Sequence, residues 1–142
     1  MDWKILAISA PLFFVTYQTL SKLLPKDTSS FLVNAYASLA GLIAMLLLHW
    51  LTVPNKSIAL PQRSLIIALT MGTLIALGNY GIIKAYSLGA PQSIFSPLFY
   101  VITIVYGIIF GLLLWHEQLN LIQLLGATLS VIGIILIIYS RK

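Results

Sequence analysis

Few side chains in this sequence could carry acid–base or metal chemistry. The 142 residues hold three acids, two histidines and no cysteine. Glu117 is the only carboxylate side chain after Asp27, and an apolar run lies on each side of it. An isolated Glu in such surroundings suits a proton carrier inside a membrane, a metal ligand, or a residue at the membrane boundary.

The other reactive side chains do not form a catalytic set. Neither His49 nor His116 has another His, Asp or Glu at metal-ligand spacing, so we expect no metal site. No Ser-His-acid set and no carboxylate pair is placed for hydrolysis. We therefore expect neither an enzyme nor a cofactor.

Composition indicates where these residues must lie. The chain is 60% hydrophobic and 8% charged, whereas a soluble domain carries about 25% charged residues. Long uncharged segments alternate with short charged breaks, which is typical of a polytopic helical membrane protein. The net charge of +5 comes from eight bases against three acids, and the bases lie near segment ends without forming a long run. This pattern indicates membrane flanks rather than nucleic-acid binding.

The segments predict an all-α membrane bundle with five transmembrane helices in a single domain, residues 1–142. The helices are expected at 3–24, 31–53, 64–87, 92–115 and 119–139. Each has the ~20 residues that a helix needs to cross ~30 Å of hydrocarbon. We expect the first to be a mature helix, because no signal-cleavage pattern follows it. The connectors are short, so consecutive helices should be antiparallel neighbours.

This layout favours the boundary interpretation of Glu117. The residue falls between the fourth and fifth helices, beside Trp115, and Trp is frequent at membrane interfaces. We place Glu117 in the first turn of the fifth helix, where a carboxylate meets the positive end of the helix dipole. A charge at the bilayer centre would be costly.

Small and polar residues mark the faces on which membrane helices pack. On 92–115 they form one stripe: Ser93, Ser96, Pro97, Tyr100, Thr103, Gly107 and Gly111. Shorter stripes are Tyr17, Gln18 and Ser21; Asn34, Ser38, Gly41, Met45 and His49; and Thr73, Tyr80 and Lys84. Such stripes are explained equally well by a solute path and by interhelical hydrogen bonds.

The glycines predict packing seams. Gly107 and Gly111 form a G-x-x-x-G pair, and Gly126 and Gly133 lie seven residues apart on the apolar last helix. Lys84 lies near the end of its helix. We favour snorkelling of its side chain to the membrane surface, and the alternative is that it meets an anionic substrate group or a carbonyl inside.

Charge predicts the orientation of the chain only weakly. Of the eight bases, three lie on the side of the N-terminus and five on the other, which leans slightly toward an outer N-terminus. Two copies could therefore insert in opposite directions and pack as an antiparallel homodimer. A bundle of five helices is also small for enclosing a path alone.

The C-terminal half resembles the EamA-type domain of the drug/metabolite transporter superfamily. The resemblance is carried by AYSLGA at the end of the third helix, S-x-x-S-P-L at the start of the fourth, Glu117, and QLLGATLSVIGIILI in the fifth. Members usually contain two inverted five-helix halves, so this chain is similar to one half. The resemblance implies solute movement, often metabolite export, and an acid between the fourth and fifth helices.

One departure from related small multidrug exporters affects the expected substrate. Those exporters carry a membrane-embedded Glu in the first helix, whereas this chain has Tyr17 and Gln18 there. We therefore expect a transporter of neutral, zwitterionic or anionic metabolites in a multi-pass cell membrane, most economically the prokaryotic cytoplasmic membrane. Its path would be lined by Tyr17, Gln18, Asn34, Ser38, Tyr80, Lys84, Ser96, Tyr100 and Thr103. The alternative is a non-transporting subunit that assists another transporter or flippase.

Overall fold

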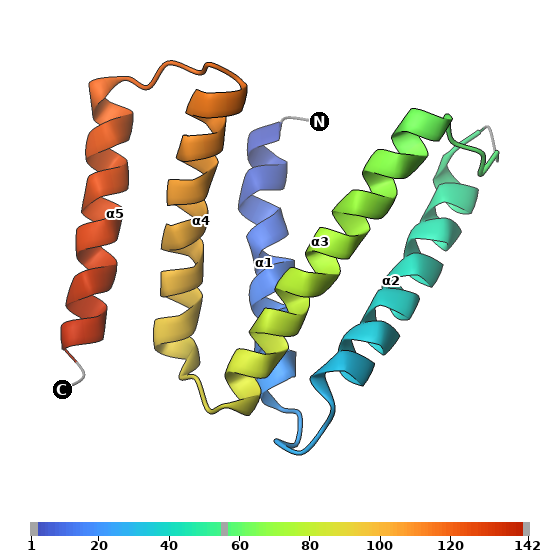
Figure 1. Cartoon of the computed structure of the whole chain (residues 1–142), viewed down its shortest axis with the longest axis horizontal. Coiled ribbons are helices and arrows are strands. Elements are labelled where there is room, and N and C mark those ends of the chain that lie inside the picture. Colours follow the sequence, from blue (N-terminus) through green and yellow to red (C-terminus); the bar gives the residue numbers. More distant parts are fainter. Residues whose placement is uncertain (1–2, 55–56, 141–142) are drawn as a thin grey trace. The chain divides into compact units, whose positions relative to one another are not determined.

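The computed structural model describes residues 3–54 and 57–140, and in these residues the chain is all-helical. Figure 1 shows the helices in chain order: α1 Trp3–Lys22, α2 Ser30–Thr52, α3 Gln62–Ser87, α4 Gln92–Leu114 and α5 Leu121–Tyr139. The predicted all-α fold is therefore confirmed.

Three predicted helix boundaries differ from the structure by two residues, and one of them is the start of the third helix, at Gln62 rather than at residue 64. The first helix ends at Lys22 rather than at residue 24, because Pro25 follows closely and cannot continue a helix. The last helix begins at Leu121 rather than at residue 119. Asn120 caps it by accepting a 2.8 Å hydrogen bond from the backbone N–H of Gln123, whose side chain accepts one of 2.9 Å from Asn120 N–H. This reciprocal pair is a capping box.

Four helices, α2 to α5, are long and apolar enough to cross a membrane. Of the five predicted membrane spans, the four that correspond to α2, α3, α4 and α5 are thus confirmed. α1 has 20 residues, and its length is sufficient. Its second half carries Thr16, Tyr17, Gln18 and Lys22, which lower its hydropathy.

The chain divides into two compact units, one of Thr16–Gly89 and one of Met1–Val15 with Ala90–Lys142. In the first unit α2 packs on α3, and Ile82, Ile83 and Tyr86 are buried. In the second unit α4 packs on α5, and Ile134 is buried.

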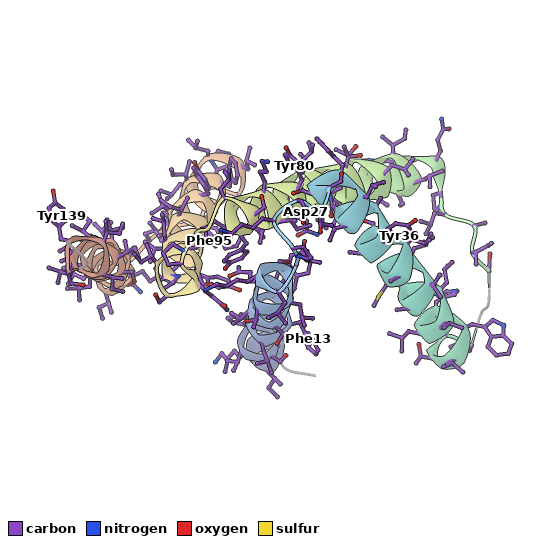
Figure 2. All side chains as sticks on the ribbon, turned by 90° about the horizontal axis from the view of Figure 1, so that it is seen from below. Phe13, Asp27, Tyr36, Tyr80, Phe95 and Tyr139 are labelled. Atoms are coloured by element: carbon purple, nitrogen blue, oxygen red, sulfur yellow. The ribbon has the colours of Figure 1, made fainter. Side chains whose placement is uncertain are left out.

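Large apolar side chains cover the outside of every described helix (Figure 2). Leu42 and Leu46 on α2 and Ile122 and Leu129 on α5 are examples, each about half exposed or more. Water would make this surface unfavourable, whereas lipid tails solvate it as well as another helix would. The exposed apolar surface and the four apolar helices identify a multi-pass membrane protein.

Candidate functional site

A cavity of about 590 Å³ lies among α1, α2 and α3 in the unit Thr16–Gly89. Its volume falls in the range of ~300–1,000 Å³ that is usual for small-molecule sites. The cavity is lined by Tyr17, Ala37, Ser38, Gly41, Leu42, Met45, Gly72, Ile75 and Asn79.

Three helices each contribute one polar side chain to this lining. Tyr17 comes from α1, Ser38 from α2 and Asn79 from α3. Within the described residues, the side chains of Ser38 and Asn79 make no hydrogen bond, so a hydroxyl and an amide are available to a ligand. No charged side chain lines the cavity. The arrangement can therefore hold a small amphipathic molecule and orient it by a few hydrogen bonds.

The cavity continues along one face of α2. Leu42 and Met45 also line a second cavity of about 260 Å³, which His49 and the connector residues Ser57 and Ile58 help to form. The face that the sequence marks as polar and small on this helix thus borders both cavities. Asn34, at the start of the same stripe, lines neither of these two cavities.

Asn34 and Gln18 take part in interhelical hydrogen bonds. Asn34 Nδ2 donates to the carbonyl of Ala76 at 2.7 Å, which joins α2 to α3. The hydroxyl of Tyr86 donates to Gln18 Oε1 at 3.2 Å, which joins α1 to α3, and the exposed fraction of Gln18 is 0%. Both are predicted path residues, and the structure places them in helix contacts. Polar contacts of this kind hold membrane helices together.

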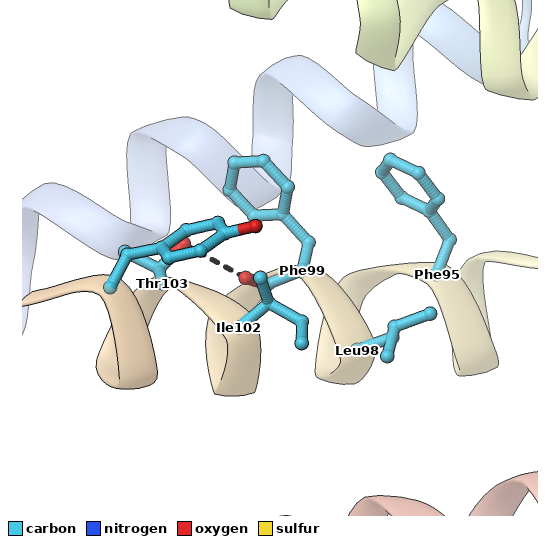
Figure 3. Close-up of a pocket in the computed structure, with 6 residues that line it drawn as sticks. Phe95, Leu98, Phe99, Ile102 and Thr103 are labelled. Carbon is cyan, nitrogen blue, oxygen red and sulfur yellow. Dashed lines mark hydrogen bonds between the residues drawn. The ribbon is translucent and has the colours of Figure 1, made fainter. Parts of the chain in front are cut away.

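The predicted stripe on α4 lies in the other unit. The Tyr100 hydroxyl makes a long contact of 3.5 Å with the carbonyl of Pro11 in α1. Thr103 Oγ donates to the carbonyl of Phe99 at 2.8 Å within its own helix (Figure 3). Ser96 lines none of the cavities described here.

A groove of about 310 Å³ runs along α4 (Figure 3). It is lined by Phe95, Leu98, Phe99, Ile102, Thr103 and Tyr106, all from this one helix. The surface is almost wholly apolar, and its only polar groups are one threonine and one tyrosine hydroxyl. Such a surface is typical of a helix face that packs against lipid or another helix. It is less suited to binding a polar solute.

Tyr80 and Lys84 do not line the cavity that contains Tyr17. They line a separate cavity of about 270 Å³ beside the α1–α2 connector. Tyr80 stacks there on Phe31 of α2, with ring centroids 4.5 Å apart and an interplanar angle of 17°. The structure therefore divides the predicted path residues of unit Thr16–Gly89 between two cavities and a set of helix contacts.

The glycine packing seams remain a prediction. In the described part of a single chain, a Cβ placed on Gly107, Gly126 or Gly133 would meet no heavy atom within 4 Å, so these positions have open space beside them. Gly111 is the exception. A Cβ there would lie 2.7 Å from Glu117 Oε2, so Gly111 makes room for a side chain and not for a helix.

Glu117 lies between α4 and α5, but not in the first turn of α5 as predicted. Asn120 separates it from that helix, and its own backbone N–H donates to the carbonyl of Gly111 at 3.1 Å. The chain therefore turns back on the C-terminus of α4 at Glu117. Its carboxylate lies beside Gly111, near the C-terminus of α4.

Asn79 and Tyr86 are not among the site residues predicted from the sequence. Gly72, Ile75 and Asn79 recur at spacings of three and four, which is the signal of one helix face. The stripe drawn through Thr73, Tyr80 and Lys84 lies beside that face. For Tyr86 no local signal exists, because its partner Gln18 is 68 residues away in sequence.

These features define a polytopic helical membrane protein with a cavity lined by three of its helices. The sequence model of the EamA-like transporter family matches residues 1–139, and the chain belongs to that family. No curated protein and no solved structure was found to match the chain. The family identifies the protein as a membrane transporter of the drug/metabolite type, and a family of transporters is consistent with a chain that is not an enzyme.

Proposed function

We propose that the protein moves small metabolites across a cell membrane by export or exchange, with the cavity among α1, α2 and α3 as part of the path. The observation that carries this proposal is the 590 Å³ cavity, into which three helices bring Tyr17, Ser38 and Asn79. Gly41 and Gly72 have no side chains, and this leaves space in the cavity that a larger residue would fill. Membership of the EamA-like transporter family supports transport as the class of function.

The lining favours neutral and zwitterionic solutes. A phenol, a hydroxyl and an amide can donate and accept hydrogen bonds, but none of them balances a full charge. An anionic solute would need a base, and Lys84, the one base among the predicted path residues, lies outside the lining. No acidic side chain lies within the described helices, so proton coupling through an intramembrane carboxylate is not part of the proposal.

The proposed working unit is an antiparallel homodimer in the prokaryotic cytoplasmic membrane, with α1 as a fifth span. Three bases against five give little preference for one orientation. Gly107, Gly126 and Gly133 have open space above them in one chain. A second copy could pack against these positions as membrane helices pack on small residues.

The test is flux through a blocked and an unblocked cavity. Proteoliposomes containing only this protein are loaded with a metabolite mixture, and efflux is followed by mass spectrometry. Gly41→Leu should fill the cavity without a clash, because a Cβ at Gly41 meets no atom within 4 Å. Gly126→Leu is the matched control, since it is equally open and lies on α5. We expect efflux of at least one solute to fall only in Gly41→Leu. Equal loss in both variants, or no efflux at all, would contradict the proposal.

The second candidate is a non-transporting subunit of another transporter or flippase. The open glycines of α4 and α5 favour it as well, because they suit any partner helix. It predicts no efflux from liposomes containing the protein alone, and a second membrane protein that co-purifies with it.

A further inference from the structure

The separate cavity that contains Lys84 has a charged lining. Its walls are the α1–α2 connector, the start of α2 and the end of α3, and its volume is about 270 Å³. It is lined by Lys26, Asp27, Thr28, Ser29, Ser30, Phe31, Tyr80, Lys84 and Ser87. Figure 2 shows Asp27 close to Tyr80, where the connector passes α3.

The residues of this lining include two lysines and one aspartate. Lys26 comes from the connector and Lys84 from the last turn of α3, and Asp27 is the only acid. None of the three makes an ion pair with another described residue. The lining thus has one more base than acid, and both lysines are available to an anion.

Ser30 adds a buried donor. Its exposed fraction is 7%, it lines the cavity, and its hydroxyl makes no hydrogen bond to the part of the chain described. Ser30 is also the first residue of α2, and the first backbone N–H groups of a helix lack partners within the helix. The hydroxyl of Ser29 accepts a hydrogen bond from the backbone N–H of Leu32 as the helix cap. Ammonium groups, a hydroxyl and first-turn amides are the donors that bind phosphate oxygens.

One side of the cavity is apolar and exposed. The stacked rings of Phe31 and Tyr80 form it, and Phe31 is 69% exposed. Phe31 is the second residue of α2, which is one of the apolar spans. The charged groups therefore lie where this span meets the membrane surface, and an exposed ring lies next to them.

We propose that this cavity binds the phosphate of an anionic phospholipid. Lys26, Lys84 and Ser30 contact the phosphate, and an acyl chain lies along Phe31. The site is distinct from the cavity of Tyr17, Ser38 and Asn79, and it does not depend on the protein's being a transporter. Asp27 opposes the anion and limits its affinity.

The test measures binding of dioctanoyl phosphatidylglycerol to the purified full-length protein in detergent by calorimetry. We expect Lys26→Gln and Lys84→Gln each to weaken binding about five-fold, the effect of one base near an anionic lipid. Asp27→Asn should tighten binding, because it removes a like charge. Lys22→Gln is the control, since Lys22 ends α1 but does not line the cavity. Melting temperatures check that each variant is folded.

Three results would overturn the proposal. Unchanged affinity in both lysine variants would remove the phosphate from this cavity. An equal loss in Lys22→Gln would indicate general surface attraction. Inorganic phosphate that binds alone as tightly as the lipid, with the same dependence on Lys26 and Lys84, would make free phosphate the ligand instead. Dioctanoyl phosphatidylcholine, which has no net charge, should bind more weakly than phosphatidylglycerol.

Discussion

Glu117 folds back onto Gly111, and its carboxylate occupies the space that a side chain at Gly111 would need. A Cβ on Gly111 would lie 2.7 Å from Glu117 Oε2 and 3.3 Å from Glu117 Cδ. The carbonyl of Gly111 also accepts hydrogen bonds from the backbone N–H groups of Trp115 and Glu117, at 3.2 Å and 3.1 Å. The single acid between the last two spans is therefore fixed to the end of α4 by a turn.

This contact predicts that Gly111→Ala destabilises the protein through Glu117. The added methyl group must displace the carboxylate, which ends a flexible side chain, so we expect a loss of about 1 kcal/mol, the lower end of the overpacking range. Reversible unfolding in mixed micelles measures it. Glu117→Ala should remove most of the cost in the double variant, since the two residues are in contact. Gly107→Ala, with nothing within 4 Å, should cost much less.

A second prediction concerns the hydrogen bond between α1 and α3. Tyr86→Phe removes the hydroxyl that donates to Gln18 Oε1 at 3.2 Å and leaves the ring in place. We expect a loss of about 0.6 kcal/mol, the average for interhelical hydrogen bonds in a membrane. Tyr106→Phe is the matched control, because that tyrosine is exposed and no hydrogen bond of its hydroxyl is seen in the described chain. Equal stability of the two variants would argue against a stabilising Gln18 contact.

A third prediction separates the two asparagines. Asn34 Nδ2 holds the carbonyl of Ala76, whereas Asn79 lines the large cavity and makes no hydrogen bond with described residues. Asn34→Leu should therefore lower the melting temperature, and Asn79→Leu should leave it unchanged while reducing solute efflux from proteoliposomes. If Asn79→Leu destabilises the protein as much as Asn34→Leu, its amide has a structural role.

The sequence predicts the helices well because each one is a long uncharged run bounded by Pro, Gly or charged residues. A predicted helix end differs from the structure where a capping interaction sets the first residue of the helix. The example is α5, where Asn120 forms a capping box with Gln123, three residues further on. The face of α2 that borders the cavities also follows from spacing alone. Pairings such as Gln18 with Tyr86 and Phe31 with Tyr80 do not, because they depend on how α1, α2 and α3 pack.

Side-chain chemistry alone also cannot tell a cavity wall from a helix contact. Ser38 and Asn34 are both polar residues on one stripe of α2, four residues apart. The structure gives Asn34 a carbonyl partner on α3 and leaves Ser38 beside the cavity. What separates them is the distance to the neighbouring helix at each turn, which no local pattern encodes.

The proposed path requires that the cavity beside Ser38 holds water while the neighbouring face of α2, which carries Leu39, lies in lipid. The chain has no cysteine, so a single introduced thiol can be labelled without background. Ser38→Cys lines the cavity, and Leu39→Cys, the next residue along, is 52% exposed but does not line it. A water-soluble thiol reagent acts on the thiolate, which forms in water and not in hydrocarbon. In proteoliposomes we expect rapid labelling of Ser38→Cys and little of Leu39→Cys; equal rates at the two positions, or none at Ser38→Cys, would contradict the proposed path.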